Sequence, residues 1–438
     1  MAETLGGKSL RSDVPRTAHA AWEPPAGRDP VAILRGIFAT LIPDLRALRG
    51  QRMARSSFAF FRGAAAVMAA DLAPTPRTGR LVQACVDAHV ANFGGYASPE
   101  QRLVFDVNDF DETARAPWEW DVKRLASSLV LAGRAAGLRP PACEDVVRAA
   151  LASYRLQTRG YAELSPRDVW YASIDVRGAI RMSLDGRAKR AWERQERDAR
   201  SRTALTLLPK ITEVVDGKPR FVDDPPLLEH LPDQHDHFAK AQRTLDAYRT
   251  TLHPEACMLV ERYQLIDVAR KVVGVGSVGT FCALLLLADD RGNELLLQVK
   301  EARASVLEPY VGAQPYATHG ERVVTGQRLM QAVSDVLLGW TEIDGRSLYV
   351  RQYRDMKTAP DVTALGAAEL ADYAAHCAWA LARAHARTGD ARPVADYLGR
   401  GDAFDSAVAA FARAYADQTE HDHAAFVAAL PTGGFLSA

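Results

Sequence analysis

Three strand-like segments joined by turns constrain the fold of this chain more than any other feature. The first, Tyr263–Lys271, leads into a glycine-rich loop. The apolar run Phe281–Ala288 follows the loop, and a short turn separates it from a third segment, Glu294–Glu301. Strand, loop, strand, tight turn and strand in this order predict an antiparallel meander. A second hairpin is predicted further on, with its turn at Asp344–Gly345.

The loop between the first two strands has glycines at 274, 276 and 279, the pattern G-x-G-x-x-G. In a dinucleotide-binding fold a helix follows this loop at once, so that its N-terminus meets the pyrophosphate. An aliphatic strand follows here, which argues against that fold. A loop that joins two antiparallel strands and covers nucleotide phosphates fits better, with Gly274, Gly276, Ser277 and Gly279 as phosphate-binding residues. The alternative is a glycine-rich hairpin without a ligand.

Lys300 lies at the end of the third strand, where a nucleotide-binding meander places a lysine on the α- and β-phosphates. The alternative is an ordinary lysine at a strand end. A helix after this strand should supply a glutamate that positions the lysine. The helical pattern at 319–331 predicts that Glu321 has this role, with Glu301 and Glu308 as second choices.

A second informative stretch covers residues 81–121 and is dense in oxygen-bearing side chains. Two apolar runs, Leu81–Val82 and Leu103–Phe105, each lead into acidic residues. Between them lies a predicted turn at Gly94–Gly95, so the stretch is predicted to form a short hairpin. Carboxylate and amide oxygens are the ligands that Mg²⁺ prefers.

The spacing within this stretch is Asp87-x-x-x-x-Asn92, a hairpin, and then a strand that ends in Asp106. Kinase-type phosphoryl transfer needs one carboxylate for the acceptor hydroxyl, and an amide and a second carboxylate for the metal. We therefore predict Asp87 as the catalytic carboxylate and Asn92 and Asp106 as Mg²⁺ ligands, with Asp109 as the fallback. Two alternatives are a polar hairpin whose Asp and Asn residues only build turns, and a metal-dependent hydrolase built on His89.

Bulk composition excludes several classes of function. Lys plus Arg and Asp plus Glu both number 54, so the formal net charge is zero and nothing suggests a nucleic-acid or membrane-surface protein. The five cysteines are scattered and form no C-x-x-C pair, which predicts a reducing compartment. No apolar run reaches membrane-spanning length and the N-terminal residues lack a secretory pattern. A cytoplasmic protein of open oligomeric state is expected.

Composition and periodicity divide the 438 residues into five regions. The expected regions are a loose tail at 1–28, a helical lobe with the acidic hairpin at 29–164, an insertion or linking region at 165–235, a nucleotide-binding β lobe at 236–357 and C-terminal helices at 358–438. Helices are predicted at Val31–Arg49, Ala64–Leu72, Trp118–Gly137, Glu144–Leu164, His235–Thr250, Leu370–Arg387, Phe404–Tyr415 and His423–Leu430. Arg52, Arg55 and Arg62 are either phosphate contacts or solvated arginines at a helix start.

Two resemblances follow from these motifs. The chain from about Arg52 onward resembles an uncharacterised bacterial family, the domain of unknown function 2252, in the stretches SSFAFFRGAA, CVDAHVANFG, LVFDVNDFDET, PWEWDVKRLA, KVVGVGSVGT, LQVKEA, GQRLMQA, YVRQYRDMK and LARAHARTGD. More distantly, Asp87, Asn92, Asp106 and Asp121 are similar to the acidic residues of the aminoglycoside/choline phosphotransferase branch of the kinase-like superfamily. Cys85 and Val86 stand where that branch has His and Gly.

The second resemblance implies an α+β, protein-kinase-like, two-lobed fold, with a small antiparallel β lobe and a helical lobe. Because the catalytic stretch precedes the glycine loop and Lys300, the fold would be circularly permuted. The implied activity is transfer of a phosphoryl group from ATP, with Mg²⁺, to a hydroxyl of an unknown, small-molecule acceptor. A nucleotide-binding module without activity and an adenylyltransferase on the same fold are the alternatives.

Overall fold

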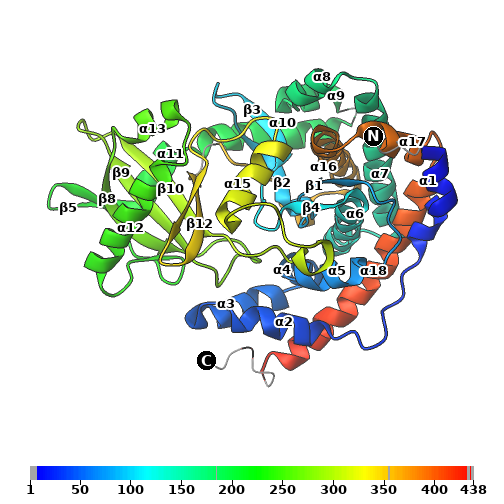
Figure 1. Ribbon diagram of the computed structural model, residues 1–438, viewed down its shortest axis with the longest axis horizontal. Helices are drawn as coiled ribbons and strands as arrows, with labels where there is room; N and C mark the ends of the chain where they lie inside the picture. The colour runs from blue at the N-terminus through cyan, green and yellow to red at the C-terminus, as the bar shows by residue number, and fades with distance from the viewer. Residues whose placement is uncertain (1–6, 184, 354–355, 432–434, 436–438) are drawn as a thin grey trace.

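The computed structural model describes residues 7–183, 185–353, 356–431 and 435. It has a sheet part, built on six strands with flanking helices, and a larger part that is mainly helical (Figure 1). We call them the sheet part and the helical part. Every strand pair among the described residues is antiparallel. The predicted α+β class is therefore confirmed.

The six-stranded sheet has the order β11-β12-β10-β9-β8-β7. The strands are β7 (Leu228–Glu229), β8 (Gln264–Lys271), β9 (Cys282–Ala288), β10 (Glu294–Glu301), β11 (Gly339–Ile343) and β12 (Arg346–Gln352). Because β8, β9 and β10 are neighbours, the predicted meander is confirmed. The second hairpin is confirmed as well: its turn residues Asp344 and Gly345 have φ of 52° and 73°, as a two-residue hairpin turn requires.

Different elements cover the two faces of this sheet. The helices of the sheet part are α11 (Ala204–Ile211), α12 (Gln234–Arg249), α13 (Pro254–Val260), α14 (Glu308–Val311) and α15 (His319–Met330). Side chains alternate along a strand, so Leu285 packs with α12 while Leu284 packs with α11 on the opposite face. Lys300 pairs in register with Cys282, two residues before Leu284, and therefore lies on the α11 face.

A nearly buried helix is the centre of the helical part. This helix, α6 (Trp118–Ala135), is buried from Trp118 to Gly133. Around it pack α7 (Pro140–Ala162), α16 (Ala367–Thr388) and α18 (Ala403–Ala429), with α17 (Ala391–Leu398) beside α7. The predicted end of α6 is confirmed, because Gly137 follows it with φ of 74°.

The acidic stretch forms two small sheets. β1 (Leu81–Ala84) pairs with β4 (Ala114–Pro117), and β2 (Phe93–Ala97) pairs with β3 (Leu103–Val107). The predicted turn at Gly94–Gly95 is wrong, because both glycines lie inside β2 and the turn follows at Ser98. Glycine is needed for a different reason: a Cβ at Gly94 would lie 2.2 Å from the Thr358 carbonyl oxygen.

The predicted loose tail at 1–28 is wrong for the residues that the structure describes there, 7–28. α1 (Gly7–Asp13) packs on α17, and the 3-10 turn Arg16–Ala20 packs on α18. His19 is fully buried and its Nε2 lies 2.9 Å from the Tyr397 hydroxyl. Arg28 bonds to both Asp71 and Asp422. The polar composition concealed these few anchoring contacts.

Two predicted helix boundaries also differ. The helix expected at Val31–Arg49 is broken before Pro43 into α2 (Pro30–Ala39) and α3 (Pro43–Ala54), since proline starts a helix well but disrupts its interior. α4 (Ser57–Gly63) and α5 (Ala65–Leu72) follow. The two helices expected near the C-terminus form the single helix α18.

Residues 165–235 connect the two parts and do not form a separate insertion. α8 (Pro166–Tyr171), α9 (Val176–Met182) and α10 (Gly186–Ser201) belong to the helical part. Trp192 of α10 packs there with its ring edge-on to Phe105 and tilted against Tyr373. α11 and the hairpin β5 (Thr212–Val215) and β6 (Lys218–Phe221) belong to the sheet part, where Leu208 and Phe221 pack against β9.

Candidate functional site

Most of the residues predicted to be functional line two adjoining cavities between the sheet part and the helical part, and Asp106, Gly279 and Glu321 line neither. The Asp87 cavity has a volume of about 180 Å³ and is lined by Asp87, Asn92, Asp109 and the loop residues Gly274, Gly276 and Ser277. The Lys300 cavity has a volume of about 470 Å³ and is lined by Lys300 and again by Asp109, Gly274 and Ser277. Segments nearly 200 residues apart in the chain thus share one cleft.

A buried carboxylate from α6 holds the loop that carries Asp87. The two oxygens of Asp121 accept hydrogen bonds from the backbone N–H groups of Cys85 and Val86, each at 2.7 Å. Val86 has φ of 72°, a conformation that is unfavourable for a β-branched residue. His385 Nε2 lies 3.2 Å from the same carboxylate. Asp121 therefore fixes a strained backbone immediately before Asp87.

Asp87 itself is ionised and oriented by its neighbours. Its Oδ1 accepts from Nε and from a terminal nitrogen of Arg124, at 2.8 and 2.5 Å. Burial alone would raise the pKa of this carboxyl, but Arg124 and His89 outweigh burial and the pKa is lowered. Burial lowers the pKa of His89 to about 3, so this histidine is neutral near pH 7. Asp87 therefore presents a fixed carboxylate to the Asp87 cavity.

Asn92 lies at the end of the same loop, in the 3-10 turn Val90–Asn92. Its Nδ2 donates to the backbone carbonyl of Asp87 at 2.9 Å. Because this bond uses the amide nitrogen, the side-chain oxygen is the atom that Asn92 can offer to a cation. The loop thus holds an amide oxygen and a carboxylate on one wall of the cavity.

Asp106 lines neither cavity, and its predicted role as a metal ligand is wrong. It is 1% exposed, and its carboxylate bonds to Arg383 of α16 at 2.7 and 2.8 Å. The backbone N–H groups of Ala332 and Val107 also donate to it. Its oxygens are therefore engaged in a buried ion pair that joins β3 to α16.

The fallback residue, Asp109, has the position that was expected of Asp106. It lines both cavities, and its Oδ1 is buried without a hydrogen-bond partner. Burial and the nearby carboxylate of Asp111 raise its pKa. A buried carboxylate oxygen without a donor fits a cation, because such an oxygen is costly to leave unpaired.

No metal site is complete within the protein itself. In the described part of the chain, no three His, Cys, Asp or Glu side chains come together in a way that could hold a metal ion. Asp109 and Asn92 each present, on the wall of the Asp87 cavity, an oxygen that accepts no hydrogen bond. Mg²⁺ is commonly bound by one or two carboxylates together with substrate phosphates and water, so this set fits Mg²⁺ only as part of a nucleotide complex.

Lys300 pairs with Asp111, and the predicted pairing with Glu321 is wrong. Lys300 Nζ lies 2.6 Å from Asp111 Oδ2, and the Tyr349 hydroxyl donates to Oδ1 of the same carboxylate at 2.5 Å. Glu321 instead accepts from the backbone N–H of Ala317 at 2.9 Å. The face of α15 that lines the Lys300 cavity carries Gln327. Glu321 lies too close to the start of α15 to reach the lysine.

The Lys300–Asp111 pair is charged. Burial opposes ionisation of both groups, but their mutual attraction outweighs it, so the pKa of Asp111 is lowered and that of Lys300 is raised. Lys300 is 2% exposed in its side chain and Asp111 is 28% exposed. The spacing of Asp109 and Asp111, two residues apart in the acidic stretch, could have indicated that both carboxylates reach the same cleft. It could not have shown that Asp111 pairs with Lys300.

Arginines of α3 hold the glycine loop from the helical part. Arg52 donates to the Gly274 carbonyl oxygen at 2.5 Å. Arg49 donates to the carbonyl oxygens of Gly276 and, at 3.1 Å, Val278. Gly279 has φ of 93°, and a Cβ there would lie 2.9 Å from Leu41. The loop is thus packed closely on α2 and α3 and is not a free hairpin turn.

The Lys300 cavity continues along β12 to the connection with the helical part. Gln298, Arg351 and Lys357 line it, and Arg351 Nε donates to Gln298 Oε1 at 3.0 Å. Residues 354 and 355, which follow β12, lie outside the described residues. The cavity therefore offers several cations and amides beside Lys300.

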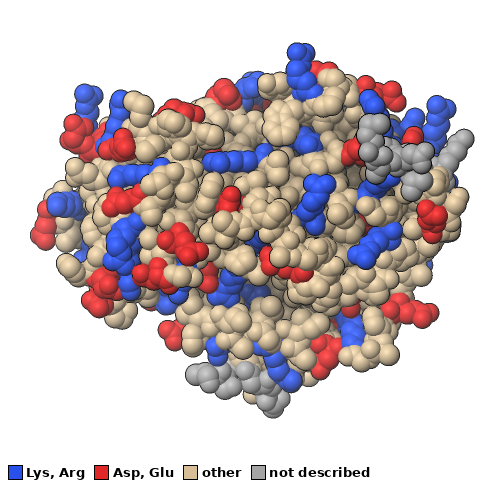
Figure 2. All heavy atoms as spheres, in the orientation of Figure 1, with Lys and Arg blue, Asp and Glu red and all other residues tan. Residues whose placement is uncertain are grey.

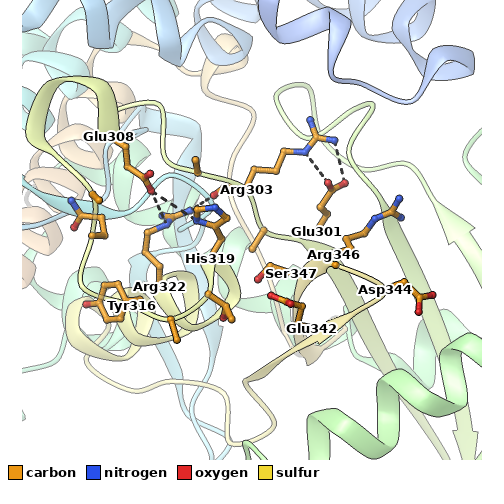
Figure 3. Close-up of a pocket in the computed structure, with 17 residues that line it drawn as sticks. Glu301, Arg303, Glu308, Tyr316, His319, Arg322, Glu342, Asp344, Arg346 and Ser347 are labelled. Carbon is orange, nitrogen blue, oxygen red and sulfur yellow. Dashed lines mark hydrogen bonds and ion pairs between the residues drawn. The ribbon is translucent and has the colours of Figure 1, made fainter.

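A separate cavity at the N-terminus of α15 has a volume of about 780 Å³ (Figure 3). Its charged residues pair with one another: Arg303 with Glu301 at 3.0 Å, and Glu308 with His319 at 3.9 Å and Arg322 at 4.0 Å. None of the residues chosen first from the sequence lines it. Its size alone does not make it the functional site.

The distribution of surface charge and the lengths of the helices do not point to a further functional site. Acidic and basic side chains are interspersed over the face shown in Figure 2, in keeping with the net charge of zero. Among the described helices, none combines the length and apolar character that a membrane span needs.

Comparison with known proteins gives one match. Residues 41–429 match the family DUF2252, described as uncharacterized proteins conserved in bacteria. No curated protein and no solved structure is similar enough to match. Because the family match covers most of the chain, this protein belongs to the uncharacterized bacterial family DUF2252.

Proposed function

We propose that this protein is an ATP- and Mg²⁺-dependent phosphotransferase with a circularly permuted, protein-kinase-like architecture. The observation that carries the proposal is the shared cleft: the glycine loop and Lys300 lie across it from Asp87, Asn92 and Asp109. Kinase-type phosphoryl transfer uses these groups, and catalysis consists mainly of positioning and electrostatic stabilisation.

In this proposal the Lys300 cavity receives the nucleotide. Lys300 contacts the α- and β-phosphates, and Asp111 with Tyr349 fixes its ammonium group. The loop Gly274–Gly279 covers the phosphates, held from behind by Arg49 and Arg52. Asp109 and Asn92 hold Mg²⁺ through their free oxygens, and Mg²⁺ neutralises phosphate charge when it is bound.

Asp87 acts on the acceptor in the small cavity. Its carboxylate is ionised near pH 7, since the charge and hydrogen bonds of Arg124 keep its pKa low against the effect of burial. It accepts a hydrogen bond from the acceptor hydroxyl and takes the proton as the oxygen forms its bond to the γ-phosphorus. The bond from that phosphorus to the β,γ-bridging oxygen breaks in the same transfer, and ADP leaves. Arg124 and the Asp121-anchored backbone keep the carboxylate in place during this transfer.

The permuted order follows from where each group lies in the chain. The groups that act on the acceptor and the metal lie at 87–109, before the nucleotide-binding strands at 264–301. The 165–235 segment connects the two parts, and α16 to α18 complete the helical part after the second hairpin. Such an order is physically acceptable because chain ends and connections can be moved between surface loops.

Thermal unfolding with and without ATP–Mg²⁺ tests the nucleotide site. A ligand at about 100 times its dissociation constant adds roughly 2.7 kcal/mol to the free energy of unfolding. We expect a clear increase in melting temperature for the wild type and none for Lys300→Met. Lys240→Met is the matched control, since Lys240 is exposed on α12 and pairs with Asp236 there. No shift in the wild type at millimolar ATP would contradict the proposal.

Turnover separates an active enzyme from a nucleotide-binding module. With labelled ATP, the proposal predicts transfer or slow hydrolysis of the γ-phosphoryl group, lost in Asp87→Asn. A product that carries AMP would indicate adenylyl transfer. Binding of ATP without any turnover across acceptors would favour the regulatory module.

A further inference from the structure

Arg62 is the least satisfied cation in the cleft. It lies in the last turn of α4 and lines the Asp87 cavity. Its Nε is buried without a hydrogen-bond partner, and within the described chain the guanidinium forms no hydrogen bond or ion pair. Burial lowers its pKa, and the carboxylates of Asp87 and Asp109 offset this only in part. A guanidinium in this state lacks a counter-ion.

The other arginines of this cavity have partners. Arg49 donates to three backbone carbonyl oxygens, of Gly276, Val278 and Gly63. Arg303 pairs with Glu301 and also donates to the Thr40 hydroxyl at 3.0 Å. Among the arginines that line the cavity in the described chain, Arg62 is therefore the one available to a ligand.

The carboxylates of the cavity are also committed. Asp87 is bonded to Arg124, and Asp111 is bonded to Lys300. Glu112 accepts from the backbone N–H of Val306 at 2.8 Å, and burial raises its pKa to about 7. In the proposed function Asp109 is occupied by the metal. Among the described residues no carboxylate forms an ion pair with Arg62, although Asp87 and Asp109 attract it from a distance, so an incoming oxyanion would satisfy its donors.

The shape of the Asp87 cavity limits the ligand. Its volume of about 180 Å³ is less than half of the roughly 470 Å³ of the Lys300 cavity. Ile37, Ala65 and Val306 contribute apolar wall beside the charged groups. A short carbon skeleton with polar groups at two ends fits this lining, while a sugar-sized or peptide acceptor would have to extend out of the cavity.

We propose that Arg62 binds a carboxylate or phosphate group of the acceptor, so that the substrate is a small molecule with both an anionic group and a hydroxyl. Arg62 would hold the anion while Asp87 receives the hydroxyl, each on a wall of the same cavity. Guanidinium suits both anions, because its donors match their paired oxygens. This inference rests on the proposed function for the identity of the site as an acceptor site.

Oxyanion binding to the full chain tests the inference with defined probes. We would titrate inorganic phosphate and acetate, with chloride at equal ionic strength as reference, and follow binding by calorimetry. The wild type should bind at least one of the two anions, and Arg62→Met should bind it at least about tenfold more weakly. Tighter phosphate binding indicates a phosphorylated acceptor, and tighter acetate binding a hydroxy acid.

Three further variants make the result specific. Lys300→Met should keep the oxyanion affinity, which excludes binding in the Lys300 cavity. Arg62→Lys should keep part of it, since the charge remains. Arg346→Met should leave it unchanged, because Arg346 lies over the Phe281 ring outside the Asp87 cavity. Circular dichroism of each variant shows whether it is folded.

The outcomes separate this inference from the proposed function. Absence of oxyanion binding in the wild type, or equal binding in Arg62→Met, would overturn the role of Arg62. If Arg62→Met lost affinity for ATP–Mg²⁺ but kept that for ADP–Mg²⁺, Arg62 would belong to the γ-phosphate and the inference would also fail. Failure of the wild type to bind ATP–Mg²⁺ would instead contradict the proposed function, whatever the anion result.

Discussion

Asp106 and Asp109 lie three residues apart and have opposite environments. Asp106 is enclosed by Arg383 and two backbone N–H groups, which satisfy both of its oxygens. Asp109 has a buried oxygen without a donor and lines both cavities of the cleft. An acidic residue in a motif is therefore structural where the protein itself supplies its hydrogen-bond donors and counter-ion, and available for function where it does not.

The same contrast separates two arginines at the glycine loop. Arg49 donates hydrogen bonds to backbone carbonyl oxygens and so holds the loop in place. Arg62 forms no hydrogen bond or ion pair within the described chain. The terminal nitrogens of Arg49 are satisfied by the fold itself, so the loss of this buried charge is costly. A buried charged side chain without partners in the protein lowers stability. Such a side chain is expected at a functional site, where a ligand supplies the missing partners.

The largest effect is expected from removing a satisfied charge. Asp106→Ala should lower the free energy of unfolding by about 3–5 kcal/mol, because Arg383 remains fully buried without a counter-ion. Asp109→Ala is the matched variant and should change it by less than about 1 kcal/mol. Urea unfolding of both proteins measures the difference. An equal loss of unfolding free energy in the two variants would contradict the different environments of Asp106 and Asp109.

A smaller difference is expected for the arginine pair. Arg49→Met removes hydrogen bonds to three carbonyl oxygens and should cost about 2 kcal/mol. Arg62→Met removes an unpaired cation and should be neutral or slightly stabilising, within about 0.5 kcal/mol. The same unfolding experiment applies. A marked loss of stability in Arg62→Met would mean that this side chain has a structural partner.

Glu112 is a third carboxyl group of the cleft, and it should make the stability of the protein depend on pH. The folded-state pKa of Glu112 is raised to about 7 by burial, so the native protein retains a proton there that the unfolded chain releases at lower pH. Stability should therefore fall as pH rises from about 4.5 to about 7, by about 3 kcal/mol from this group.

Glu112→Gln removes this contribution, and its free energy of unfolding should fall less steeply across that window. Glu342→Gln, an exposed change in the cavity at the N-terminus of α15, should keep the wild-type slope. Unfolding curves at several pH values measure both. Identical slopes for Glu112→Gln and the wild type would show that Glu112 is solvated.

Much of the fold could be predicted from periodicity and turn residues. The meander, the Asp344–Gly345 hairpin and α6 with its terminal glycine follow from local patterns that tertiary contacts did not override. The loose tail was wrong because a few residues, such as His19 and Arg28, find buried partners almost 400 positions away. Local composition does not contain such distant contacts.

The site could be predicted as a set of segments but not in its pairings. The chain shows that Lys300 needs a carboxylate, yet only the fold brings Asp111 to it from 189 positions earlier and turns Glu321 toward Ala317. Likewise, the strand ending in Asp106 looks like a metal-binding strand until Arg383 of α16 occupies that side. Which oxygen is left free is a property of packing.

The most direct measurement of the central claim is the Mg²⁺ dependence of ATP affinity, obtained by calorimetry for the wild type and for Asp109→Asn. We predict that Mg²⁺ tightens ATP binding to the wild type and that this gain in affinity is largely lost in Asp109→Asn. The variant should remain folded and as stable as the wild type. ATP that does not bind the wild type, or an equal gain from Mg²⁺ in both proteins, would contradict the claim that the two distant halves of the chain form one nucleotide site.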